Sequence, residues 1–399
     1  MNNQLPFVLK KYVLCLIAGI LLLEMIPVCS VPNVGKLFGV QQVYALEESD
    51  LYAKSALLMD ADSKRVLYQK NGYEKLPMAS TTKIMTCLVA LENASADDVV
   101  EFSSYASSMP KVKMGAPAGS RFYMKDLLYS LMLESHNDTA VAIAEKVGGS
   151  VEGFAAMMNE RAKKMGAMDT NFVTPNGLDD QDHYTTAYDL ALIAAQAIQN
   201  DEFVKIINTD SHTFHEIDGK SNYSVNNKDA FLGMMDGAMG IKTGFTGNAG
   251  YCFVGAVRSG NKTLISVVLA SGWPPSKTYK WKDTIKLMNY GLEHFNYRVI
   301  FSGIEDYRML QVKNGVKKEV GTTIYGECSA LMSDFDHVEY EYLFDEKKEA
   351  PVYENETVGI MKIIVNGEEL ARFEIKAKKT VKRIDFKYSV LKILHTFLL

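Results

Sequence analysis

Residues 77–93 have the sequence PMASTTKIMTCLVALEN, a polar start followed by an apolar run. Ile84 and Leu88 recur at helical spacing, which predicts a helix that begins near Ser80. Residues three apart share one face of a helix, so the Lys83 amine can reach the Ser80 hydroxyl. A serine hydroxyl becomes a nucleophile when a neighbouring base takes its proton. An amine can be that base once burial or a second cation lowers its pKa.

Serine–lysine pairs at the same spacing recur at Ser108, Ser259 and Ser389. A helix-capping serine beside an exposed lysine explains any one such pair taken alone. The pair at Ser108 contains Pro110, the one at Ser259 falls in a predicted hairpin turn, and the one at Ser389 lies in the tail. Ser80 precedes a long apolar helix and is therefore the candidate nucleophile.

Two further motifs follow Ser80 along the chain. Ser135-His136-Asn137 falls in a turn within a block of predicted helices, and Lys242-Thr243-Gly244 falls on a predicted strand. Each motif alone is weak evidence for an active site. S-x-N recurs at Ser224 and Ser259, and a lone K-T-G is also found on strands that carry a solvated lysine. Their order and structural context make the set far more specific than its parts.

The order of predicted elements indicates an α/β fold. Strands come first, at 55–59 and 66–68, then a helical block, then strands from 238 to 269 and a closing helix at 281–294. The two strand groups can form one mostly antiparallel sheet covered by helices, with an all-helical subdomain beside it. From about 297 to 381 short alternating segments and the Asn366-Gly367 turn predict a small all-β domain.

Composition excludes several classes of partner. The 399 residues carry a net charge of −5 and no basic block, so nucleic acid is a poor candidate. No C-x-x-C pair or histidine cluster indicates a metal, and no cofactor is expected. Cys87, Cys252 and Cys328 are widely spaced in apolar surroundings, which favours lone buried thiols over a disulfide framework.

The N-terminus has the pattern of a secretory signal peptide. Lys10 and Lys11 precede a short apolar run, and Val43-Tyr44-Ala45 supplies small residues at the cleavage positions. Residues 1–45 are therefore the predicted signal peptide, with an uncleaved anchor as the second interpretation.

The C-terminal segment from 382 to 399 predicts an amphipathic helix that lies in the plane of a membrane surface. Apolar residues fall on one face at Phe386, Val390, Ile393, Leu394 and Phe397. The segment is too short to span a bilayer. The alternative is a terminal helix packed on the β domain.

Taken together, the three motifs match the signature of serine β-lactamases and penicillin-binding proteins. Residues 46–295 resemble the low-molecular-mass serine D-alanyl-D-alanine carboxypeptidases. The similarity extends to Asn137-Asp138, to 183–187 (HYTTA) and to 246–251 (TGNAGY). The resemblance implies a β-lactamase/transpeptidase-like domain at 46–296, an all-β domain at 297–381 and an anchoring helix at 382–399.

The resemblance also implies roles for the motif residues. Ser80 would attack the carbonyl between the last two D-alanines, and Lys83 would accept its proton. Ser135 and Lys242 would pass that proton to the departing D-alanine, while Asn137 would hold the substrate amide or orient Lys83.

The expected substrate-binding residues follow on the strand: Thr243, Gly244, Phe245 and Thr246. The backbone N–H groups of Ser80 and Phe245 would form the oxyanion hole, and Thr243 with Thr246 would bind the terminal carboxylate. Lys277 and Lys280 are both candidates for a second cation at that carboxylate.

The implied partners are a peptidoglycan stem peptide ending in D-Ala-D-Ala, β-lactam antibiotics as covalent inhibitors, and membrane lipid. A class A β-lactamase is one rival, but it needs a glutamate for deacylation, and the loop at 176–184 holds none. A D,D-endopeptidase and a catalytically inactive binding protein are the others. His136 stands where the family has glycine, and it either narrows the cleft, titrates near the site, or is a packed or solvated histidine.

Overall fold

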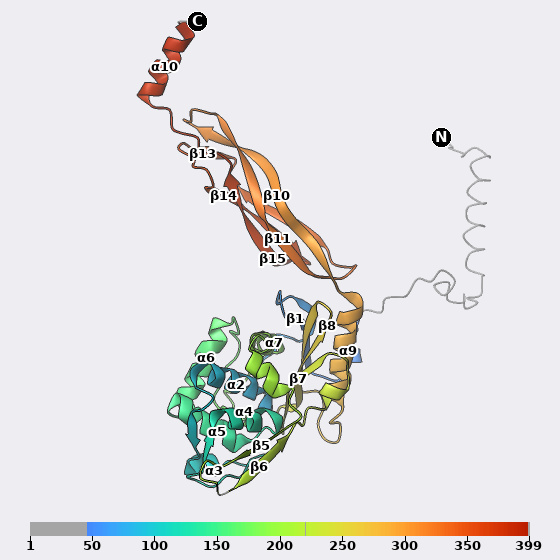
Figure 1. Ribbon diagram of the computed structural model, residues 1–399. Helices are drawn as coiled ribbons and strands as arrows, with labels where there is room; N and C mark the ends of the chain where they lie inside the picture. Colours follow the sequence, from blue (N-terminus) through green and yellow to red (C-terminus); the bar gives the residue numbers. More distant parts are fainter. Residues whose placement is uncertain (1–45, 220, 398–399) are drawn as a thin grey trace, which may run out of the picture. The chain divides into compact units, whose positions relative to one another are not determined.

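The computed structural model describes residues 46–219 and 221–397 (Figure 1). The predicted signal peptide, residues 1–45, lies outside the described residues and stays a prediction.

The first domain is built on a five-stranded antiparallel sheet in the order β2-β1-β9-β8-β7. Every residue of β1 and all but the first of β9 are buried, as expected of central strands covered on both faces. β7, which carries Lys242-Thr243-Gly244, is an edge strand of this sheet. Its strands are β1 (Ser55–Asp60), β2 (Val66–Lys70), β7 (Ala238–Thr246), β8 (Gly250–Ser259) and β9 (Lys262–Leu269).

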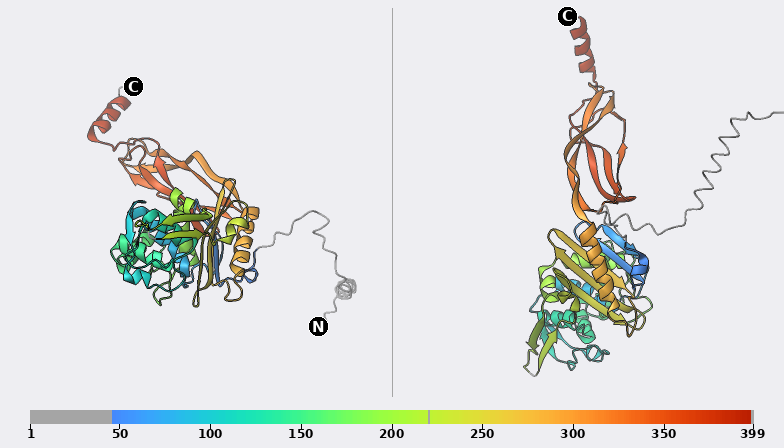
Figure 2. Two further views of the ribbon diagram at one scale, coloured as in Figure 1. Left: turned by 60° about the horizontal axis from the view of Figure 1, so that its bottom comes forward. Right: turned by 90° about the vertical axis from the view of Figure 1, so that its right-hand side faces the viewer.

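Helices cover both faces of this sheet. α9 contacts β8 and β9 on one face, and α7 contacts β1 and β9 from the side of the helical block (Figures 1 and 2). The helices of this domain are α2 (Lys83–Asn93), α3 (Ser104–Ser107), α4 (Met124–Leu133), α5 (Asn137–Gly148), α6 (Val151–Lys164), α7 (Ala187–Ala197), α8 (Asp201–Ile207) and α9 (Tyr279–His294), with 3₁₀ turns η2 (Glu48–Asp50), η3 (Ala79–Thr82) and η4 (Ala230–Gly233). The predicted α/β architecture, with its mostly antiparallel sheet and helical subdomain, is confirmed.

Two small two-stranded antiparallel sheets in this domain were not predicted: β3 (Val99–Glu101) with β4 (Arg121–Tyr123), and β5 (Ser211–His215) with β6 (Asn222–Asn226). Each of these strands buries a single side chain, such as Phe214 in β5 and Val225 in β6. One buried residue per strand gives almost no alternating apolar pattern for sequence analysis to detect.

A β-rich C-terminal domain follows, as predicted. Its six strands have the order β12-β14-β15-β11-β10-β13. The predicted turn at Asn366-Gly367 joins β14 to β15, and both residues have positive φ, +52° and +86°, as a type I′ hairpin requires. The strands are β10 (Asn296–Lys313), β11 (Glu319–Met332), β12 (Val338–Phe344), β13 (Lys347–Glu349), β14 (Thr357–Val365) and β15 (Glu368–Ala377).

The described chain ends in helix α10 (Phe386–Phe397), none of whose residues is buried. Phe386 and Phe397 are 85% and 84% exposed, and the apolar residues between them are also exposed. The Tyr388 hydroxyl donates a hydrogen bond to the carbonyl of Val316, 3.3 Å away. Among the described residues, no helix has the length and apolar character needed to cross a bilayer.

Candidate active site

Ser80 and Lys83 are brought together by a 3₁₀ turn that leads into helix α2. Ser80 lies within η3, and α2 itself begins only at Lys83, so the α-helix starts later than predicted. Side chains three apart are eclipsed in a 3₁₀ turn, and Lys83 Nζ lies 3.0 Å from Ser80 Oγ. Ala79, directly before Ser80, has a φ of +49°, a strained conformation of the kind that clusters at functional sites.

The three contacts of the Lys83 amine suit a neutral base. Two are pure acceptors, Asn137 Oδ1 at 2.9 Å and the carbonyl of Asn176 at 2.6 Å. The third is the Ser80 hydroxyl. A neutral amine has two N–H groups and one lone pair, so donating to both acceptors leaves the lone pair for the Ser80 O–H.

Burial favours that neutral form. Lys83 is fully buried, and burial lowers the pKa of its amine well below the ordinary lysine value. The nearby Lys242 ammonium lowers it further, against the opposing effect of Asp138.

The second motif forms the tight turn between α4 and α5. Ser135 has a φ of +67°, and Asn137 is the first residue of α5. The Asn137 amide donates from Nδ2 to the carbonyl of Pro110 at 3.3 Å, which fixes its oxygen toward Lys83. Ser135 Oγ is buried and has no hydrogen-bond partner within the described part of the chain. Its hydrogen-bonding capacity is therefore not used by the described residues.

Strand β7 passes close to Ser80 and packs against η3. A Cβ on Gly244 would lie 3.1 Å from the backbone nitrogen of Ser80, so the position suits glycine. The Lys242 amine is buried and donates to the Thr243 carbonyl at 3.1 Å. Burial lowers the pKa of Lys242 to about 8, opposed by Asp229 and assisted by the cation of Lys280.

Beyond Gly244 the strand becomes accessible. Phe245 is 43% exposed, and Thr246 Oγ1 donates a 2.6 Å hydrogen bond to Asp179 Oδ1. Thr246 thereby joins the strand to the loop that contains Asn176.

Several residues that support the site were not predicted. Asn176 contributes a backbone carbonyl, and Gly177 follows with a φ of +81° and room for no side chain, since a Cβ there would lie 1.9 Å from the Ala79 carbonyl oxygen. Asp229 accepts a hydrogen bond from the backbone N–H of Ile241 at 3.1 Å. Its negative charge opposes the lowering of the Lys242 pKa. The asparagine–glycine pair had been predicted only as a loop.

His183 belongs to the segment that resembled the family, and it is a structural residue. Its Nε2 lies 2.8 Å from Thr82 Oγ1, and its Nδ1 accepts from the backbone N–H of Val173 at 3.0 Å. Burial lowers the pKa of His183 to about 4, so the imidazole is neutral near pH 7 and joins the loop to η3.

Comparison with known proteins gives the family. The family model for D-alanyl-D-alanine carboxypeptidases matches residues 42–272, more than half of the chain. The chain belongs to this family.

Curated relatives extend the similarity over nearly the whole chain. The D-alanyl-D-alanine carboxypeptidase DacF of Bacillus subtilis is 29% identical over 95% of this chain and 96% of its own. The D-alanyl-D-alanine carboxypeptidase DacC of Escherichia coli is 28% identical over 86% of this chain and 87% of its own. The structure of penicillin-binding protein 5 from Haemophilus influenzae superposes with a TM-score of 0.68 at 26% identity, covering 85% of this chain and all of that one.

The protein is thus a serine-type D-alanyl-D-alanine carboxypeptidase of the penicillin-binding class. This favours the carboxypeptidase interpretation over the β-lactamase and the inactive binding protein. Within the described residues, no group of histidine, cysteine and carboxylate side chains is arranged to hold a metal ion.

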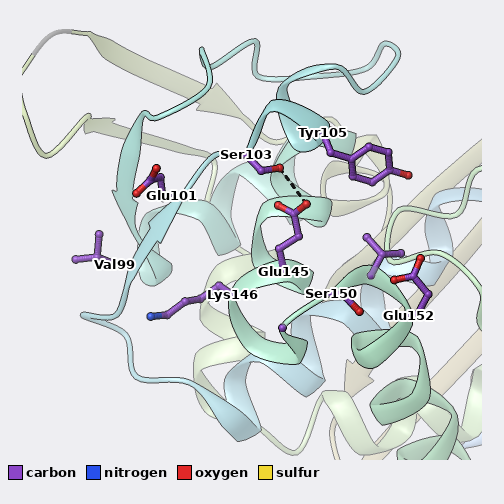
Figure 3. Close-up of a pocket in the computed structure, with 10 residues that line it drawn as sticks. Val99, Glu101, Ser103, Tyr105, Glu145, Lys146, Ser150 and Glu152 are labelled. Carbon is purple, nitrogen blue, oxygen red and sulfur yellow. Dashed lines mark hydrogen bonds between the residues drawn. The ribbon is translucent and has the colours of Figure 1, made fainter.

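A surface hollow of 660 Å³ elsewhere in this carboxypeptidase contains none of the motif residues (Figure 3). Glu101, Glu145 and Glu152 line it, and Ser103 Oγ donates to Glu145 at 2.9 Å. The hollow therefore lies apart from the buried Ser80–Lys83 pair and from the Lys242-Thr243-Gly244 strand.

Proposed function

We propose that this enzyme removes the terminal D-alanine from peptidoglycan stem pentapeptides through an acyl-enzyme on Ser80. The observation that carries the proposal is the buried Lys83 amine, which lies 3.0 Å from Ser80 Oγ and also contacts Asn137 Oδ1 and the Asn176 carbonyl. In the neutral form its two N–H groups can donate to those two acceptors, which leaves its lone pair for the Ser80 O–H. A base so placed can take the serine proton as the new bond forms.

The reaction has two stages. Ser80 Oγ bonds to the penultimate carbonyl carbon as its proton moves to Lys83. Negative charge then develops on the carbonyl oxygen, where the N–H groups of Ser80 and Phe245 would stabilise it. The carbon–nitrogen bond breaks as Ser135 and Lys242 relay a proton to the departing D-alanine. Water then hydrolyses the Ser80 ester.

Thr243 and Thr246 would bind the terminal carboxylate, and Lys280 is the better supported of the two candidate cations. Its amine is half-buried 5.1 Å from the ring centre of Tyr251, and its charge lowers the pKa of Lys242. Lys280 is therefore electrostatically coupled to the β7 site. Lys277 is exposed, and its charge acts on Lys280.

The remainder of the stem peptide has room beside this strand. A hollow of 550 Å³ adjoins the loop of Asn176 and is lined by residues that include Asp179, Tyr184 and Asn248. Asp179, which lines the hollow, also accepts a hydrogen bond from Thr246 on the proposed carboxylate-binding strand.

Penicillins would acylate the same serine and leave slowly. The segment from Asn176 to Tyr184 contains three aspartates and no glutamate, the residue that class A β-lactamases use for deacylation. A persistent adduct follows from that difference.

We further propose the domain limits 46–296 and 297–381, export by the signal peptide, and attachment to the outer face of the cytoplasmic membrane by 382–399. The apolar face of α10 is exposed, and Lys387, Lys392 and His395 lie off it. An uncovered amphipathic helix with cations beside its apolar face suits an anionic lipid surface.

The direct test is release of free D-alanine from a D-Ala-D-Ala-terminated pentapeptide. The wild-type enzyme should release it and the Ser80→Ala variant should not. A crosslinked dimeric peptide in a parallel assay measures any endopeptidase activity. Release by the Ser80→Ala variant at the wild-type rate would refute the proposal.

A further inference from the structure

His136 lies between two residues of the proposed site, Ser135 and Asn137. Its side chain is buried, with 6% of the residue exposed, so the solvated histidine considered from the sequence is excluded. Both ring nitrogens have partners: Nδ1 lies 2.8 Å from Ser130 Oγ, and Nε2 lies 3.3 Å from Glu134 Oε2. The imidazole is therefore packed into the support of the turn.

The partners determine which nitrogen carries the proton. Glu134 also accepts from the backbone N–H of Asn226 and from Lys228, and these contacts hold the pKa of Glu134 low although partial burial opposes them. A carboxylate can only accept, so His136 Nε2–H donates to Glu134. The neutral imidazole then accepts at Nδ1 from the Ser130 hydroxyl.

The surroundings of the ring favour its neutral form. Burial is the main cause that lowers the pKa of His136. Asp138 and Glu134 oppose that shift from the same turn. Ser130 Oγ, having donated to the imidazole, can accept from Thr139 Oγ1 at 3.0 Å.

The resulting series of hydrogen bonds, from Thr139 through Ser130 and His136 to Glu134, joins three parts of the fold. Ser130 belongs to the last turns of α4, and Thr139 belongs to the first turn of α5. Glu134 connects to the end of β6 through Asn226 and to the following segment through Lys228. The backbone N–H of Lys228 also donates to the Leu133 carbonyl at 3.1 Å.

The turn needs such support. Ser135 holds a left-handed φ of +67°, which is strained for a non-glycine residue. Its buried hydroxyl has no hydrogen-bond partner among the described residues, so its position depends on the backbone of the turn and on side-chain packing.

We propose that His136 is a positioning residue for acylation: its imidazole, held between Ser130 and Glu134, fixes the backbone that aims Ser135 and Asn137 at the Ser80–Lys83 pair. The inference rests on the proposed acylation of Ser80. The imidazole touches neither substrate nor the reacting atoms, and it acts through the residues on either side of it.

The test measures acylation of the mature full-length enzyme by benzylpenicillin, with the rate constant of acylation separated from the initial binding constant, and the melting temperature recorded alongside. His136→Ala should slow acylation roughly tenfold or more, with little change in initial binding, because small misplacements at a reacting centre cost that much. His136→Gln, whose amide can still donate to Glu134, should recover part of the rate.

A matched control is His212, which pairs with Asp126 at 2.8 Å against the same helix α4 but lies outside the motif. His212→Gln should leave the acylation rate constant unchanged even if it lowers the melting temperature. Glu134→Ala should resemble His136→Ala, and the double variant should be no slower than the worse single variant, since both changes break one chain.

Acylation within twofold of wild type in a folded His136→Ala enzyme would overturn the proposal, as would fully additive losses in the double variant. If His136→Ala does not fold, the Glu134→Ala and His136→Gln variants decide by the same criteria. A wild-type enzyme that fails to acylate at all would instead refute the proposed function.

Discussion

The backbone carbonyl of Asn176 accepts a hydrogen bond from the Lys83 amine across 2.6 Å, so a loop distant in sequence fixes the proposed base. The adjoining Gly177 allows this approach because it has no side chain to meet η3. The position of the Lys83 amine thus depends on Gly177, a residue without a functional side chain.

Gly177→Ala should therefore disable the site. The new methyl would lie 1.9 Å from the Ala79 carbonyl oxygen, on a backbone at φ +81°. Overpacking and left-handed strain together should lower the free energy of unfolding by about 2 kcal/mol or more and slow acylation by penicillin. Denaturant unfolding and the acylation rate measure the two effects.

Gly119→Ala is the control for this change. Gly119 has a similar φ of +85°, and a Cβ there meets nothing within 4 Å. The Gly119→Ala variant should lose stability through backbone strain alone, and its acylation rate should equal that of the wild type. Equal effects of the two substitutions would contradict the proposed close approach.

Much of the fold could be predicted from the sequence because its signals are local. The spacing of Ser80 and Lys83, the apolar strands and the Asn366-Gly367 turn each lie within a few residues. The Asn176 carbonyl and Asp229 could not be found in this way. A backbone acceptor has no residue identity, and Asp229 reaches Lys242 only through the tertiary fold.

Lys242 should impose an alkaline limit on activity. Its pKa is lowered to about 8, and the ammonium form is the one proposed to act, so kcat/KM should fall as pH rises through about 8. Lys242→Arg should lack that fall, because a guanidinium stays charged throughout. Lys242→Ala should cost roughly 10²–10³ in rate at neutral pH. A wild-type profile that is flat from pH 7 to about 9, the range spanning this pKa, would contradict the assignment.

Two peptides that differ only at the C-terminus can show whether Lys280 or Lys277 binds the terminal carboxylate. One peptide ends in a free carboxylate and the other in a carboxamide. Lys280→Met should lower kcat/KM for the carboxylate about 10-fold or more and reduce the preference for it, since a charge-assisted contact contributes about 1.5–3 kcal/mol. Lys277→Met should leave the preference intact. The reverse result would assign the role to Lys277.

The tail should hold the mature enzyme on the membrane. A chain that stops after Lys382 should move to the soluble fraction when cells are fractionated. Within the helix, Ile393→Gln alters the exposed apolar face and should weaken attachment, whereas Thr396→Gln lies off that face and should not. A truncated enzyme that remains fully membrane-bound would place the anchor elsewhere.

The most direct measurement of the central claim is the mass of the protein and its peptides after incubation with benzylpenicillin and removal of the excess drug. We expect one adduct, on the peptide that contains Ser80, in both the wild type and the Ser108→Ala control, and none in Ser80→Ala. The adduct should outlast many turnovers of a typical enzyme working at about 10 s⁻¹. An adduct on another residue, or one that disappears within about a second as a β-lactamase would release it, would contradict the account.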